Sequence, residues 1–68
     1  MTDLRRKIFD YYKSQIKENG YPPTLIETAG KCKCNPSYVW YTLEYLEKRG
    51  YIAKEPKTKR TVKILRED

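Results

Sequence analysis

Two cysteines and the absence of histidine limit the chemistry that this 68-residue chain can carry. Cys32 and Cys34 are one residue apart, and two thiols are too few for a structural zinc site, which needs four ligands. A disulfide between them would close a tight, strained ring. We therefore predict that both thiols pack in the core, with no metal or other cofactor. Without histidine, paired carboxylates or a glycine-rich phosphate loop, the chain is not expected to be an enzyme.

Aromatic residues recur at helical spacing in the middle of the chain. Tyr38, Tyr41 and Tyr45 follow an i, i+3, i+7 pattern, and Trp40 lies beside them. Three interpretations are open: contact with thymine methyl groups and sugars in a DNA major groove, a protein interface, or packing of part of the stripe, Tyr45 first, against another element. This segment has no Lys or Arg in its first half, so a bidentate arginine–guanine contact is not available there. We expect a modest or A·T-leaning base preference.

Positive charge is concentrated towards the C-terminus. The chain has 15 Lys and Arg against 9 Asp and Glu, and residues 48–66 hold eight basic residues against one acid, Glu55. Such a cluster in a small domain is typical of a polyanion binder, although a solvated face is the alternative. If phosphate neutralisation supplies most of the affinity, binding should weaken steeply as salt rises.

An amphipathic pattern predicts the first element that positions these residues. Asn19-Gly20 supplies the left-handed residue that ends a helix, and Thr2 or Asp3 can cap its start. The helix is predicted over about residues 3–19, with an apolar stripe at every fourth position: Leu4, Ile8, Tyr12 and Ile16.

A capping box marks a second helix. The Thr24 side chain can accept from the backbone N–H of Glu27, whose carboxylate can reach back to the N–H of Thr24. We predict a short helix over about 25–29, with Gly30 permitting a turn. In residues 31–34, lysine and cysteine alternate, which should point the thiols towards the core and the lysines towards solvent.

The third helix has clear ends in the sequence. Asn35 is a good N-cap, Pro36 suits the first helical position, and Lys48-Arg49-Gly50 provides a basic last turn followed by glycine. These signals predict a helix over about 36–49, with a buried stripe at Val39, Leu43 and Leu46.

Residues 51–65 indicate a basic β-hairpin, or wing. Residues 51–54 and 61–65 fit two short strands joined by a polar loop. We therefore predict one domain over residues 1–68, mainly α with a small β-hairpin: a three-helix winged helix-turn-helix. In the helix-turn-helix plan the helix over 36–49 lies in the major groove of DNA.

Three motifs make the chain resemble the N-terminal DNA-binding domain of LexA repressors, over about residues 8–64. They are Gly20-Tyr21-Pro22-Pro23-Thr24, Pro36-Ser37-x-Val39, and Leu43-x-x-Leu46-Glu47-x-x-Gly50-Tyr51-Ile52. The resemblance implies that bases are read from the start of the third helix, by Asn35, Ser37, Tyr38, Trp40 and Tyr41. For the wing it implies contact with the DNA backbone or minor groove through Lys54, Lys57, Lys59 and Arg60. We also expect backbone contacts from Thr24, Lys31 and Lys33.

These observations predict a sequence-specific regulator of transcription, most simply a repressor, that binds double-stranded DNA as a homodimer on paired half-sites. The alternative is an interaction module that binds another regulator, a protein, through the aromatic face of the third helix. No stretch approaches the roughly 20 apolar residues that span a bilayer, and the N-terminus lacks a signal peptide, so we expect a cytoplasmic protein with no membrane partner. The self-cleaving Ser/Lys domain of LexA is not among these residues, so we expect no autoproteolysis from them.

Overall fold

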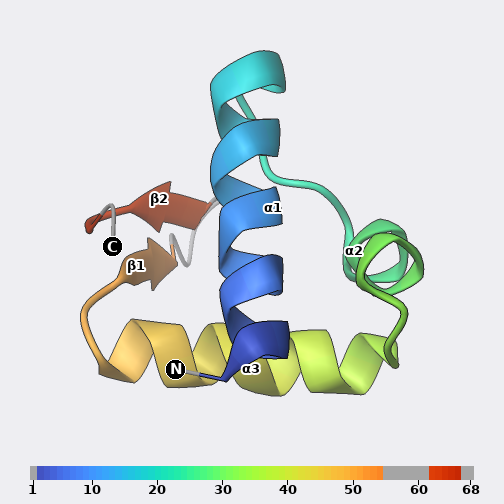
Figure 1. Cartoon of the computed structure of the whole chain (residues 1–68). Coiled ribbons are helices and arrows are strands. Elements are labelled where there is room, and N and C mark those ends of the chain that lie inside the picture. Colours follow the sequence, from blue (N-terminus) through green and yellow to red (C-terminus); the bar gives the residue numbers. More distant parts are fainter. Residues whose placement is uncertain (1, 55–61, 67–68) are drawn as a thin grey trace.

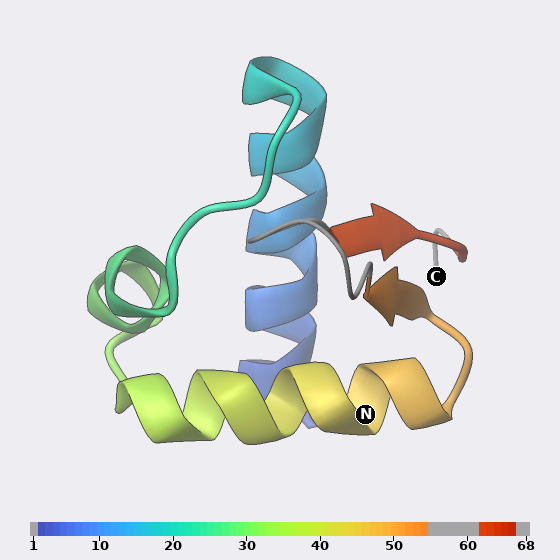
Figure 2. The same ribbon diagram turned by 180° about the vertical axis from the view of Figure 1, so that it is seen from behind.

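Three helices and a two-stranded sheet make up residues 2–54 and 62–66, the part of the chain that the computed structural model describes. In the ribbon views α1 stands upright across α3, with α2 on one side of α1 and the strands on the other (Figures 1 and 2). This arrangement confirms the predicted mainly α fold with a small β-sheet, a three-helix winged helix-turn-helix. The elements are α1 (Asp3–Asn19), α2 (Leu25–Cys32), α3 (Pro36–Lys48), β1 (Ile52–Lys54) and β2 (Val62–Ile64).

The first helix has the bounds that its sequence predicts. Thr2 is the N-cap, and its hydroxyl accepts the backbone N–H of Arg5 at 3.3 Å. Gly20 ends the helix in the left-handed region at φ 82°, and its N–H donates to the carbonyl of Ile16 at 2.8 Å. Glycine adopts this conformation without the penalty that a Cβ would impose.

The second helix is longer than predicted. Its capping box forms in full: the Glu27 N–H donates to the Thr24 hydroxyl at 3.0 Å, and the Thr24 N–H donates to the Glu27 carboxylate at 2.9 Å. The helix then runs through Gly30 to Cys32, so the prediction of a turn at Gly30 was wrong.

Burial explains the extra turn of α2. Thr28, Ala29 and Cys32 lie on one face of the helix and are all buried. Glycine inside a helix costs about 1 kcal/mol relative to alanine, and burial of this face offsets that cost. The helix ends at Lys33, a left-handed residue at φ 59° and ψ 52°. Lys31 and Cys32 therefore belong to α2 rather than to the turn that follows it.

The alternation nevertheless gave the right exposure for three of its four residues. Cys32 is buried, and Lys31 and Lys33 are exposed. Cys34 is only half-buried, although it packs against the core cluster. Core packing is thus confirmed for Cys32 and is partial for Cys34.

The third helix begins at Pro36 as predicted and ends at Lys48, one residue early, with Gly50 in the left-handed region at φ 79°. Thr42, which the sequence did not single out, is also buried. Its hydroxyl donates to the carbonyl of Tyr38 at 2.8 Å, which satisfies the polar group inside the protein. The predicted stripe is buried at all three positions, Val39, Leu43 and Leu46.

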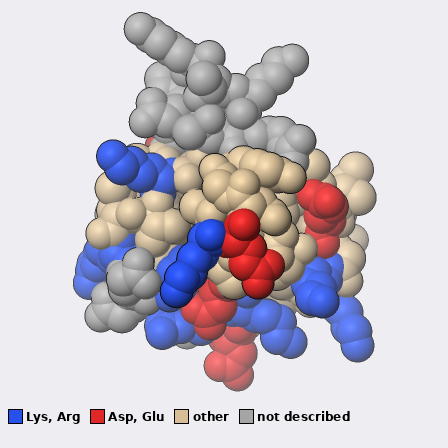
Figure 3. Space-filling view, turned by 90° about the horizontal axis from the view of Figure 1, so that it is seen from above, with Lys and Arg blue, Asp and Glu red and all other residues tan. Residues whose placement is uncertain are grey.

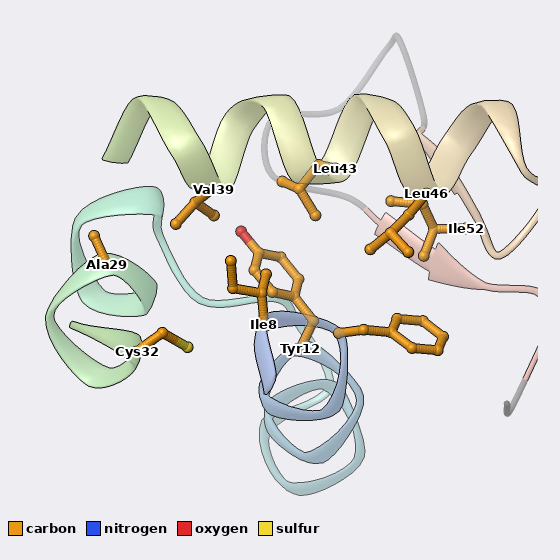
Figure 4. Packing of buried hydrophobic residues seen from close by; sticks show 9 residues of the cluster. Ile8, Tyr12, Ala29, Cys32, Val39, Leu43, Leu46 and Ile52 are labelled. Carbon is orange, nitrogen blue, oxygen red and sulfur yellow. The ribbon is translucent and has the colours of Figure 1, made fainter. Parts of the chain in front are cut away.

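The core lies where the three helices meet. Ile8 and Tyr12 of α1 point into the space between α3 and the face of α2 that carries Ala29 and Cys32, as Figure 4 shows. Ile52 of β1 lies at the opposite end of this cluster, beside Leu46. None of the described helices is both long and apolar enough to cross a membrane.

The two strands are antiparallel, with Ile52 opposite Ile64. Tyr51 joins their base to the core: its N–H donates to the carbonyl of Leu46 at 2.9 Å, and its carbonyl accepts from Leu65 at 2.8 Å. Its ring also meets the buried ring of Phe9 edge-on, with centroids 5.4 Å apart. The base of the wing is therefore anchored to both α1 and α3.

Candidate nucleic-acid interface

Helices α2 and α3 form the pair that presents the candidate interface. Three residues, 33–35, separate the end of α2 from the start of α3. The turn is tight because Lys33 is left-handed and the Cys34 N–H donates to the carbonyl of Ala29 at 2.9 Å. This is the helix-turn-helix arrangement, in which the second helix is the one that enters the major groove.

The start of α3 carries exposed groups that are suited to contacts with bases. Asn35 is the N-cap residue, yet its side chain makes no capping hydrogen bond to α3, all of which lies in the described part of the chain. Its amide, with both a donor and an acceptor, lies on the surface next to the exposed hydroxyl of Ser37.

Trp40 and Tyr41 form an exposed aromatic pair one turn further along. Their rings meet edge-on, with centroids 5.2 Å apart and an interplanar angle of 79°. Trp40 is 46% exposed and Tyr41 is 66% exposed. Adjoining exposed aromatic rings on a surface helix are suited to contact with a partner.

The other tyrosines of α3 have a different environment. Tyr38 and Tyr45 are half-buried and pack against the core cluster. The Arg5 guanidinium of α1 lies over the Tyr45 ring, 4.3 Å from its centroid. The predicted aromatic stripe is therefore not uniformly exposed, and the interpretation that Tyr45 packs on another element is the one that the contacts fit.

The residues predicted to meet the DNA backbone fall into three groups. Thr24 already uses its hydroxyl as the acceptor of the capping box. Lys31 and Lys33 are exposed at the end of α2, on the turn that leads into α3. Lys54 lies in β1, while the remaining wing residues are outside the described residues: Lys57, Lys59 and Arg60.

Three residues near the interface were missed in the sequence. Ile26, on the first turn of α2, is 75% exposed, and the capping box could have located it because it places this side chain at the second helical position. Arg5 and Arg49 both lie over Tyr45. Arg49 follows Tyr45 by four residues, a helical spacing that could have revealed the contact, whereas Arg5 is too far away in the chain to give a local signal.

The described cations are not confined to one side of the molecule. Seen from above, Lys and Arg side chains lie at the left, lower and right edges, with carboxylates between them (Figure 3). Asp10 holds two cations on the surface of α1, Arg6 at 3.8 Å and Lys13 at 3.5 Å. Which cations remain available to an anion is therefore decided by local contacts rather than by net charge alone.

The two thiols are free in the structure. Burial raises the pKa of the Cys32 thiol above its usual value, and the neighbouring Cys34 raises this pKa further, against a smaller opposing effect of Lys7. A neutral thiol is a poor metal ligand and a poor nucleophile. Among the described residues, no three His, Cys, Asp or Glu side chains come together as a metal site would require.

Comparison with known proteins gives one consistent result. Residues 1–61 match the family model of the LexA DNA binding domain. A LexA repressor from Thermosipho melanesiensis is 32% identical over 66 residues, which cover 97% of this chain and 33% of the relative. LexA repressors from Oceanobacillus iheyensis and Clostridium kluyveri are 39% and 40% identical, over 96% and 94% of this chain and 33% and 32% of their own lengths. The chain thus spans about one third of the length of the relatives that it matches.

Proposed function

The chain belongs to the LexA DNA-binding domain family, and we propose from this membership that it is a sequence-specific regulator that binds double-stranded DNA and represses transcription. One observation supports the proposal most directly. After a three-residue turn, α3 exposes about half of Trp40 and most of Tyr41 on its outer face. This face is the part of a helix-turn-helix that enters the major groove.

We assign the base contacts to the first half of α3. The Asn35 amide can form paired hydrogen bonds with adenine, and the Ser37 hydroxyl can serve either partner of a base pair. Trp40 and Tyr41 offer apolar surface to thymine methyl groups, and Tyr38, half-buried, lies at the edge of this set. Since this half of the helix has no guanine-reading arginine, the preferred sites are A·T-leaning.

Backbone contacts flank these residues on the two neighbouring elements. Lys31 and Lys33 would neutralise phosphates beside the turn, with the Thr24 hydroxyl available as a donor at the start of α2. On the other side the wing would contribute its basic residues, Lys54, Lys57, Lys59 and Arg60. Log affinity should then fall steeply and linearly with log salt.

In this proposal the protein acts in the cytoplasm as a homodimer on paired half-sites, as many helix-turn-helix proteins do. Its role is that of a regulator rather than an enzyme. The family match does not favour the alternative of a protein-interaction module, although the aromatic pair by itself would fit one.

Selection of bound sequences from random duplex DNA tests the proposal. We expect a recovered motif that is rich in A·T pairs and repeated as an inverted pair of half-sites. A single half-site would contradict the dimer but not DNA binding. Failure to enrich any sequence, together with no retention of bulk duplex DNA, would contradict the proposed function itself.

Charge reversal at Lys57 and Lys59, compared with Trp40→Ala plus Tyr41→Ala, separates the two classes of partner. If DNA is the ligand, both sets of changes weaken binding to the selected duplex. Should a protein be the ligand, only the aromatic changes disrupt its capture.

A further inference from the structure

Two arginines that are far apart in the chain lie over the same ring. Arg5, in the first turn of α1, has its guanidinium carbon 4.3 Å from the centroid of Tyr45. Arg49, at the end of α3, has its guanidinium carbon 5.2 Å from the same centroid. The fold therefore brings two positive charges to one point on the flank of α3.

Neither guanidinium has an acidic partner among the described residues. The neighbouring Arg6 shows the difference, because its guanidinium forms an ion pair with Asp10 on the same helix at 3.8 Å. Arg5 turns the other way, and its Nε is buried without a hydrogen-bond partner in the described structure. A buried donor without an acceptor costs about 1–3 kcal/mol.

Stability alone does not account for this arrangement. Arg49 lies at the negative end of the α3 dipole, which favours a cation, but Arg5 lies at the positive end of the α1 dipole, which disfavours one. A cation over an aromatic ring contributes only about 0.5–1 kcal/mol at exposed sites. Two converging guanidinium groups beside the positive end of a helix favour the binding of an anion.

We propose that Arg5 and Arg49, positioned by the Tyr45 ring, bind one phosphate of the DNA backbone beside α3. This inference rests on the proposed function and adds a contact to it. The planar guanidinium offers paired N–H donors that match phosphate oxygens. Around α3 at 100° per residue, Tyr45 lies roughly 140° from Trp40 but only about 40° from Tyr41, so this phosphate site is separate from Trp40 and borders Tyr41.

The test uses Arg5→Gln, Arg49→Gln and the double variant, with Arg6→Gln as the matched control. Arg6 is on the same turn of α1 and carries the same charge, but its guanidinium already forms an ion pair with the Asp10 carboxylate. Binding to a mixed-sequence duplex of about two helical turns is followed by fluorescence anisotropy between about 50 and 200 mM salt. Each lost phosphate contact reduces the slope of log affinity against log salt by about 0.9, which is about eightfold in affinity near 0.1 M.

We expect both single variants to lower the slope and the affinity, equally for selected and unselected duplexes, because a phosphate contact carries no base information. The control should retain the slope of the unchanged chain. Arg49 is exposed and follows the helix, so its variant keeps the test valid if Arg5→Gln loosens α1.

Two results would overturn the inference, and they are distinguishable. If the arginine variants melt earlier but keep the slope of Arg6→Gln, the cluster only ties α1 to α3. If the unchanged chain does not bind duplex DNA at all, the proposed function fails together with the phosphate site.

Discussion

Two pairs of aromatic residues on one helix have opposite environments. Trp40 and Tyr41 contact each other and are exposed, whereas Tyr38 and Tyr45 pack against the core, and Tyr45 also lies beneath Arg5. Both pairs consist of aromatic residues of the same helix, although Trp40 and Tyr41 are adjacent in the chain and Tyr38 and Tyr45 are seven residues apart. The difference comes from what the neighbouring elements place over each ring.

The aromatic residues of α3 therefore fall into two structural roles. The side with Tyr38 and Tyr45 joins the helix to the core and to α1. Trp40 and Tyr41, about 100° apart around the helix, offer exposed apolar surface to a partner. A helix that exposes aromatic rings needs such an anchored side, because exposed rings add little to its stability before a partner binds.

Replacing Tyr45 is the largest test of this division. Tyr45→Ala should lower the free energy of unfolding by about 2 kcal/mol, somewhat less than the roughly 3–5 kcal/mol for a fully buried ring. Tyr41→Ala, the exposed counterpart, should change it by less than about 0.5 kcal/mol. Urea unfolding followed by circular dichroism measures both. Equal losses would mean that the two pairs do not differ in structural role.

Removing the exposed pair, Trp40 and Tyr41, tests whether these rings contact a partner. Trp40→Ala with Tyr41→Ala should weaken binding to a selected duplex about tenfold or more, since truncation of an aromatic anchor costs more than about 1 kcal/mol. The melting temperature should stay close to that of the unchanged chain. Titration of labelled DNA gives the affinity. Unchanged affinity would show that these rings do not touch DNA.

The N-caps of α2 and α3 also differ in structural role, with a smaller expected effect on stability. Thr24 holds a complete capping box, whereas Asn35 makes no side-chain capping bond to the described helix α3. Thr24→Ala should therefore cost about 1 kcal/mol of stability, and Asn35→Ala only a few tenths.

The effects of the same two substitutions on DNA affinity should follow the opposite order from their effects on stability. Asn35→Ala should weaken binding to the selected duplex more than Thr24→Ala does, because the Asn35 amide is proposed to contact a base. Thermal melting and anisotropy on the same two variants provide the measurements. A large stability loss from Asn35→Ala would place its side chain in a structural role.

The smallest expected effect is on the pH dependence of stability and concerns the thiols, of which Cys32 is buried and Cys34 is half-buried. Burial raises the pKa of Cys32 in the folded protein, so its neutral form is favoured there. The unfolded chain ionises this thiol at its ordinary pKa of about 8.5. Stability from this group is therefore complete below that pH and is lost as pH rises through the raised pKa. Unfolding measured from pH 7 to 10.5 should show a shallower alkaline loss for Cys32→Ala than for the unchanged chain.

Local signals accounted for most of the fold. The glycine after α1, the capping box of α2 and the apolar stripe of α3 all depend on neighbours within a few residues. The last turn of α2 was missed because local propensity argues against Gly30, while burial of Cys32, a tertiary effect, decides the outcome.

The candidate site was harder to predict for the same reason. The position of α3 and of its exposed residues follows from helical period, so Trp40 and Tyr41 could be identified. The burial of Tyr38 depends on packing against the core, and the approach of Arg5 to Tyr45 joins two helices that are far apart in the chain. Neither has a pattern in the sequence.

One residue of the turn has a further consequence. Lys33 holds the left-handed conformation in which α2 ends, and glycine would hold it at a cost lower by roughly 1 kcal/mol. Lys33→Gly is thus a simple way to make the protein more heat-resistant, but it removes a cation proposed to meet the DNA backbone. A laboratory selection for thermal tolerance would favour glycine at this position, and one for operator affinity would favour lysine. The position thus carries a trade-off between stability and activity.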